Sequence, residues 1–212
     1  YKDSFTLFET DILEVTSVTK NLKSKTSSGY DNIPTDIIKL SINCTAPHLV
    51  KIINKSFAEG NVPNFLKIAK LCPIFKNGEA TKISNYRPIS VLPSFSKVFE
   101  KLVYNRLIKY LTKSSVLYDH QYGFRSNLST SMAILEMVEK ITDAIDNNKF
   151  SIGIFIDLSK AFDTVNHNVL VNKLHFYGIR GTALNWFNRQ QYVLYNGTAS
   201  ARLLVTCGVP QG

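Results

Sequence analysis

The chain has 212 residues, of which 44% are hydrophobic, and it carries a formal net charge of +9. No stretch approaches the roughly 20 apolar residues of a membrane-spanning helix, so we expect no membrane partner. Cys44, Cys72 and Cys207 lie far apart and form no Cys-x-x-Cys pair, which argues against a zinc site and against a disulfide-linked partner. Free cysteines are typical of reducing compartments, so we expect an intracellular protein of the nucleus and cytoplasm.

The positive charge is concentrated in the middle of the chain. Residues 51–125 contain 13 Lys and Arg against 4 Asp and Glu, whereas the counts are 5 against 6 before this segment and 7 against 6 after it. A segmental excess of this kind is typical of nucleic-acid binding. The alternative is a solvated, lysine-rich helix face, because some of these basic residues fall at helical spacing.

The first part of the chain has the pattern of helices and loops. An amphipathic helix is expected over residues 11–25, followed by a loop over residues 27–31. Pro34 and Thr35 favour the start of a short helix that runs through Leu40. A separate helix is expected from Pro47 to Ala58, with its end near Gly60.

A hairpin and two long helices come next. Residues 68–75 are expected to be extended, with a turn at residues 76–79 and a second arm at residues 86–92, which places Lys76 and Arg87 on facing arms. A helix after Pro93 and a second one ending near residue 148 follow, separated by a loop over residues 118–128. We expect their apolar stripes to be core; the inward residues are Val98, Leu102 and Leu111 in one helix and Ile134, Val138, Ile141 and Ile145 in the other.

An apolar run, residues 150–156, ends at Asp157, and a second carboxylate follows at Asp163. Such a run suits a strand buried on both faces, so Asp157 would lie where a buried sheet meets solvent. The alternative is that Asp157 or Ser159 caps a helix that begins at Lys160. This helix is expected to end near Gly178, and Asn196-Gly197 predicts a later hairpin.

Five short motifs, in order along almost the whole chain, resemble those of the reverse transcriptases of non-LTR (LINE, Jockey-like) retrotransposons. They are Pro73-Ile74-Phe75-Lys76, Asn85-Tyr86-Arg87-Pro88-Ile89-Ser90, Gln121-Tyr122-Gly123-Phe124-Arg125 with Ser129-Thr130, the block from Asp157 to Asp163, and Gly208-Val209-Pro210-Gln211-Gly212. A single short motif would not be specific, whereas five in the family's order are.

The resemblance implies an α+β fold of the right-hand polymerase type, with helical fingers that carry a β-hairpin and a truncated palm sheet. The implied division is an N-terminal helical extension of the fingers over residues 1–56, the fingers over 57–148 and a partial palm over 149–212. Because the chain begins with Tyr1 and stops within the last motif, we expect a fragment without the family's later Asp-Asp pair and thumb.

The resemblance also implies RNA-directed DNA polymerase activity. A DNA primer 3′-hydroxyl attacks a deoxynucleoside triphosphate (dNTP), on an RNA template, between two Mg²⁺ (or Mn²⁺) ions. Asp157 resembles the catalytic, metal-binding aspartate, and the Leu158 carbonyl would be a further oxygen ligand. Asp163 is expected to be structural. A single aspartate cannot hold two metal ions, so the fragment itself is expected to be inactive.

Four residues resemble nucleotide-binding positions. Arg87 fits the finger residue that grips the triphosphate, because a planar guanidinium binds phosphate oxygens bidentately, and Lys76 is a weaker candidate for the same task. Phe162 has the position of a steric gate against a ribose 2′-hydroxyl; a buried core aromatic is the alternative. Gln211 resembles a residue that lines the nucleotide pocket.

Gly29 and Asp31 resemble an upstream motif near the template path, and an ordinary turn explains them at least as well. The chain departs from the family pattern at Leu66, where a tryptophan is usual, and in a contraction after Phe187. A rival hypothesis is therefore a non-catalytic, nucleic-acid-binding remnant or domesticated domain. A viral RNA-directed RNA polymerase is disfavoured by Phe162 and by the block around Arg87.

Overall fold

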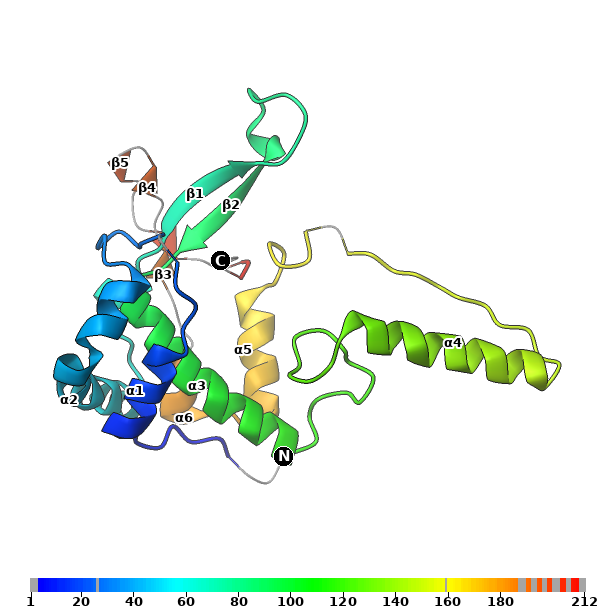
Figure 1. Ribbon diagram of the computed structural model, residues 1–212, viewed down its shortest axis with the longest axis horizontal. Helices are drawn as coiled ribbons and strands as arrows, with labels where there is room; N and C mark the ends of the chain where they lie inside the picture. The colour runs from blue at the N-terminus through cyan, green and yellow to red at the C-terminus, as the bar shows by residue number, and fades with distance from the viewer. Residues whose placement is uncertain are drawn as a thin grey trace. The chain divides into compact units, whose positions relative to one another are not determined.

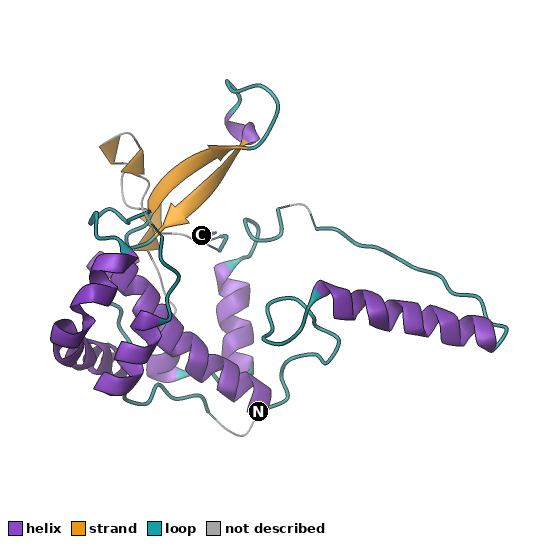
Figure 2. Ribbon diagram, viewed as in Figure 1, coloured by secondary structure: helices purple, strands orange, loops and turns teal. Residues whose placement is uncertain are grey.

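The structure, a computed structural model, describes residues 4–25, 27–158 and 160–186, and also residues 190–191, 194–195, 198–199, 203–204 and 207–209. The contacts divide the chain into a first unit, Tyr1–Tyr110 with Lys160–Gly212, and a second unit, Leu111–Ser159. Helices and antiparallel strands occur side by side in the first unit (Figure 2). The predicted α+β class is confirmed.

Three helices build the main core of the first unit: α1 (Ile12–Lys20), α2 (Thr35–Glu59) and α3 (Ser94–Lys113) (Figure 1). Each presents an apolar stripe at helical spacing, which is the pattern that buries one face of a helix. The buried members are Val15 and Val18 of α1, Ile42, Ala46, Leu49, Ile53 and Phe57 of α2, and Val98, Phe99, Leu102 and Val103 of α3. The predicted inward positions Val98 and Leu102 are confirmed.

The predicted break between two helices near Pro47 is wrong, because α2 runs without interruption from Thr35 to Glu59. Proline costs the helix one hydrogen bond, to the carbonyl of Asn43. Residue Asn43 is exposed, so solvent can satisfy that carbonyl. The buried stripe continues on both sides of Pro47, and its packing outweighs the local preference. The helix ends as expected, at Gly60 in the left-handed conformation.

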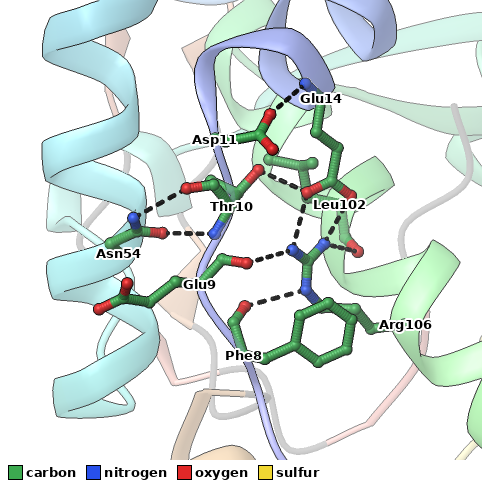
Figure 3. Close-up of polar contacts among 8 residues, drawn as sticks. All are labelled: Phe8, Glu9, Thr10, Asp11, Glu14, Asn54, Leu102 and Arg106. Atoms are coloured by element: carbon green, nitrogen blue, oxygen red, sulfur yellow. Dashed lines mark hydrogen bonds and ion pairs between the residues drawn. The ribbon is translucent and has the colours of Figure 1, made fainter.

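A buried arginine ties the N-terminal segment to α3 (Figure 3). The Arg106 guanidinium, 3% exposed, forms a bidentate ion pair with Glu14 at 2.9 and 2.8 Å. It also donates to the carbonyls of Phe8, Glu9 and Leu102 at 3.1 Å each. These bonds use all the directions in which a guanidinium donates, which is the arrangement that a buried charge requires.

Thr10 extends this contact to α2 (Figure 3). Its hydroxyl donates to Glu14 at 2.6 Å, and its backbone N–H and C=O pair with the Asn54 side-chain amide at 2.8 and 3.0 Å. The N-terminal segment is thus held to α1, α2 and α3 by polar contacts as well as by packing.

The later helices of the first unit are α5 (His167–Phe176) and α6 (Gly181–Trp186). Trp186 is buried in the main core, and its indole N–H donates to Ser56 at 3.2 Å. A smaller cluster joins Phe5 to Ile179 and Ala183. Chain segments from opposite ends of the sequence therefore share the hydrophobic interior of this unit.

The strands form two-stranded antiparallel pairs. Strands β1 (Lys70–Phe75) and β2 (Tyr86–Val91) make the predicted hairpin, which extends from the helices (Figure 1). Further along, β4 (Leu194–Tyr195) pairs with β5 (Thr198–Ala199), as a hairpin at this place requires, and β3 (Gln190–Gln191) pairs with β6 (Leu203–Leu204). Asn196 and Gly197 themselves lie outside the described residues.

The second unit contains α4 (Thr130–Asp146), the predicted helix, with its N-cap at Ser129. The expectation that its apolar stripe is core is wrong: none of its residues is buried, and Ile134 and Val138 are 54% and 48% exposed. Apart from the end of α3, α4 is the unit's one described helix, which is too little to enclose a hydrophobic interior.

The buried strand expected before Asp157 is not present in the described structure. Residues 150–158 form no ladder with another described strand, and Phe150 and Ile154 are 100% and 82% exposed. A strand exists only through hydrogen bonds to a neighbour, and no described strand in the second unit supplies them.

Candidate active site

The β1–β2 hairpin brings Lys76 and Arg87 to one face. Ile74 lies opposite Arg87 in the ladder, and the Lys76 N–H donates to the Asn85 carbonyl at 2.8 Å, which continues the register by one residue. Because side chains alternate between faces, Lys76 is a diagonal neighbour of Arg87, at a spacing of roughly 7–8 Å in such ladders. Both side chains are exposed and form no ion pair within the described part of the first unit.

The turn of this hairpin is longer than predicted and is held by side chains. Asn85 donates to the Glu79 carbonyl at 2.9 Å, and the Tyr86 hydroxyl donates to the Ala80 carbonyl at 2.8 Å. Gly78 has φ +90°, and a Cβ there would lie 2.7 Å from the Asn85 amide nitrogen. The local sequence therefore fixes the ends of the strands from which Lys76 and Arg87 project.

Asp157 and Leu158 lie at the end of the described second unit. The Asp157 carboxylate is exposed and makes no hydrogen bond or ion pair within the described part of that unit, and Leu158 is 69% exposed. No group of three or more His, Cys, Asp or Glu among the described residues is arranged to hold a metal ion. A free carboxylate and a carbonyl are hard oxygen donors of the kind that Mg²⁺ prefers, but they are an incomplete set.

The alternative role for Asp157, as a helix cap at Lys160, is wrong in this structure. Lys160 has φ +53°, outside the helical region, and residues 160–164 form a turn. Helix α5 begins only at His167, and its cap is Asn166, whose side chain accepts from the N–H groups of Asn168 and Val169 at 2.9 and 3.2 Å. Ser159 lies outside the described residues.

The turn at residues 160–164 meets the last described segment of the chain. The Val209 N–H donates to the Phe162 carbonyl and the Gly208 N–H to the Val165 carbonyl, both at 2.8 Å. Phe162 is 44% exposed, so the core alternative for this ring is wrong. Two motifs about 45 residues apart in sequence are therefore adjacent in the first unit. Gln211 lies outside the described residues.

Gly29 and Asp31 belong to a loop that packs against the start of α3. A Cβ at Gly29 would lie 2.7 Å from the backbone nitrogen of Pro93, so glycine is required by close backbone approach. The Asp31 carboxylate accepts from the Ile33 N–H at 3.2 Å, as in an Asx turn. These contacts give both residues a structural role, and their part in template binding stays a prediction.

Sequence reasoning missed Glu136, a residue of α4 that organises the loop of the Gln-Tyr-Gly-Phe-Arg motif. Its carboxylate contacts His120 at 2.6 Å, Lys140 at 2.5 Å and the Tyr122 hydroxyl. Hydrogen bonds from Lys140, Tyr122 and His120 lower its pKa to about 2. Glu136 and Lys140 have the spacing of a helical ion pair, but nothing in the sequence indicates the contacts to the loop.

A second residue missed by sequence reasoning is His167, the first residue of α5. Its Nε2 atom lies 2.6 Å from the Gly208 carbonyl oxygen. The sequence around His167 could not predict this contact, because its partner lies 41 residues further along the chain.

Comparison with known proteins identifies the same family as the motifs. The model of the family described as reverse transcriptase (RNA-dependent DNA polymerase) matches residues 74–212. In the described part of the chain, no helix combines the length and the apolar character needed to cross a membrane. Cys44, Cys72 and Cys207 are free thiols.

Several curated proteins of mobile elements are similar to almost the whole chain. The probable RNA-directed DNA polymerase from transposon BS of Drosophila melanogaster is 32% identical over 94% of this chain. The RNA-directed DNA polymerase from mobile element jockey of the same species is 29% identical over 100% of the chain, and that from transposon X-element, also described as probable, is 29% identical over 94%. The chain spans only 22–24% of the length of these relatives.

Proposed function

The chain belongs to the reverse transcriptase (RNA-dependent DNA polymerase) family, and we propose that it is part of an RNA-directed DNA polymerase encoded by a non-LTR mobile element. The observation that carries the proposal is the match over residues 74–212, which contains four of the five motifs in full and all of the first except Pro73. The proposed substrates are dNTPs, with an RNA template and a DNA primer as partners. The proposed site of action is the nucleus and cytoplasm.

Asp157 and the Leu158 carbonyl are the proposed ligands of Mg²⁺ or Mn²⁺. The Asp157 carboxylate is exposed and has no partner within the described second unit, which supports this role because its oxygens are available to bind a metal ion. Bound there, the metal would neutralise charge on the phosphates and orient the reacting oxygens. Two oxygen donors cannot complete the coordination of two ions, so other carboxylates, substrate phosphates and water must supply the rest.

Arg87 and Lys76 are the proposed contacts to the triphosphate of the dNTP. Two exposed cations on one face of a hairpin, with no internal counter-charge in the described first unit, support this role. Phe162 and Gln211 are proposed to line the sugar and base side of the pocket. The contact between the Phe162 carbonyl and the Val209 N–H supports a shared pocket for the two motifs.

We assign residues 1–56 to an N-terminal extension of the fingers, 57–148 to the fingers and 149–212 to part of the palm. Gly29 and Asp31 are proposed to lie near the template. The tight packing of Gly29 on Pro93 supports a rigid loop at this position, which is what a template contact through backbone groups would need.

The test is primer extension by a longer protein that contains this chain, with an RNA template, a DNA primer, dNTPs and Mg²⁺. Extension that needs all four supports the proposal. A protein that binds RNA yet extends no primer, with either Mg²⁺ or Mn²⁺, would contradict it and favour the non-catalytic remnant. The 212-residue chain alone is the matched control and should not extend the primer.

A further inference from the structure

Residues 162–167 hold Gly208 and Val209 from several sides. The Gly208 N–H donates to the Val165 carbonyl and the Val209 N–H donates to the Phe162 carbonyl, each with an N···O distance of 2.8 Å. Asn166 and Cys207 form an antiparallel bridge next to them. The Gly208 carbonyl is reached by a side chain instead, since His167 Nε2 lies 2.6 Å from its oxygen.

The backbone at Gly208 has a conformation that favours glycine. Its φ is +91°, a conformation that L side chains rarely adopt, and a Cβ there would lie 3.2 Å from the Asp163 carbonyl oxygen. Glycine loses more conformational freedom on ordering than any other residue. The Gly208 carbonyl and the Val209 N–H belong to one planar peptide unit, so the hydrogen bond to Phe162 and the contact with His167 hold the two ends of the same peptide.

The chemistry of the contact defines the state of the histidine. A carbonyl oxygen only accepts, so His167 must carry a proton on Nε2. Both the neutral Nε2–H tautomer and the imidazolium meet this condition. The contact therefore does not require a charged ring.

We propose that His167 is a positioning residue for nucleotide selection: by holding the Gly208 carbonyl, it fixes Gly208 and Val209, the first two residues of the last motif, against the turn that carries Phe162. The inference rests on the proposed function, in which Phe162 and Gln211 line one pocket. In this proposal His167 acts through the backbone of Gly208 and not by direct contact with the nucleotide.

The first experiment uses this chain and does not depend on catalysis. Hydrogen exchange of the Gly208 and Val209 amides is measured in the parent, in His167→Asn and in His167→Gln. A glutamine amide reaches about as far as Nε2, whereas an asparagine amide falls short. We expect exchange of both amides to rise about three- to tenfold in His167→Asn, as the loss of one hydrogen bond predicts, and to stay near the parent value in His167→Gln.

Two controls accompany this measurement. His175→Asn changes an exposed histidine of the same helix and should leave both amides unchanged. Fluorescence of the buried Trp186 reports whether each variant keeps the fold of the first unit. Parent-like exchange in His167→Asn, or equal losses in the asparagine and glutamine variants, would overturn the inference.

The second experiment uses the longer polymerase that contains this chain. We expect His167→Asn to raise KM for dNTPs and the ratio of ribonucleotide to deoxynucleotide incorporation, with a smaller effect on kcat, and His167→Gln to restore both. Altered exchange without any change in KM or in this ratio would make the contact purely structural and would overturn the positioning role. An inactive parent would instead contradict the proposed function, and the exchange experiment alone would then decide whether His167 orders Gly208.

Discussion

Asp157 is exposed and unpartnered within the described second unit, so its side chain can be changed without disturbing internal contacts. In a longer polymerase that contains this chain, we expect Asp157→Asn to abolish nucleotide addition, because the amide keeps the shape and loses the charge that holds the metal. RNA binding should be unchanged. Primer extension and RNA titration of the same preparation check both statements, and extension at the parent rate would refute Asp157 as the metal ligand.

Phe162 is 44% exposed, which separates its effect on selectivity from its effect on stability. We expect Phe162→Ala to raise ribonucleotide incorporation relative to deoxynucleotide incorporation, and to lower the free energy of unfolding by less than about 1.5 kcal/mol. Phe99→Ala is the matched control, because Phe99 is 2% exposed and its loss should cost about 3–5 kcal/mol. An unaltered incorporation ratio would remove Phe162 from the nucleotide pocket.

At the scale of elements, the ion pair between Arg106 of α3 and Glu14 of α1 joins parts of the sequence that are 92 residues apart. We expect Arg106→Met to lower the free energy of unfolding by about 3–5 kcal/mol, because it removes the charged partner of the Glu14 carboxylate and a donor from each of three carbonyls. Denaturant unfolding measures this change.

The matched control for Arg106 is Lys55→Met, which breaks the exposed pair with Glu59. Exposed helical pairs contribute about 0.5 kcal/mol or less. If the two variants lost similar amounts of unfolding free energy, burial of Arg106 would not increase the contribution of its ion pair to stability.

The same contact predicts a dependence of stability on pH. Partial burial raises the pKa of Glu14, but hydrogen bonds from Arg106 and Thr10 and the Arg106 charge outweigh it, so the pKa lies below its ordinary value of 4.5. The carboxylate therefore contributes stability above the unfolded-state pKa, and this contribution is lost as the pH falls through the folded-state pKa. In Glu14→Gln, unfolding free energies measured across this range should depend less on pH than in the parent; equal slopes would contradict the assignment.

For the whole molecule, the basic middle segment predicts weak RNA binding that falls with salt concentration, because phosphate contacts release counterions. Not every cation in this segment takes part, since Arg106 is buried. We expect Arg87→Gln to reduce the slope of log affinity against log salt by about 1. Lys82→Gln carries the same charge change on the same hairpin, but Lys82 is already paired with Glu79 at 3.1 Å, so it should have a smaller effect. Affinity independent of salt would refute the phosphate contacts.

Local patterns were sufficient for much of the fold and of the candidate site. Side-chain periodicity over a few positions predicts the apolar faces of helices α1 and α4. Turn residues and extended segments predict the β1–β2 hairpin in the same local way. Family membership follows from short motifs in order, which are also local in sequence.

Burial and long-range contacts were decided by the tertiary structure. Periodicity shows which face of a helix is apolar but not whether another element covers it, so α4 and the apolar run before Asp157 were wrongly expected to be buried. Pro47 predicts a break because proline costs a helix one hydrogen bond, whereas packing on both sides of Pro47 keeps α2 continuous. The contacts of Arg106 with Glu14 and of His167 with Gly208 join residues 92 and 41 positions apart, and only the folded chain brings such partners within hydrogen-bonding distance.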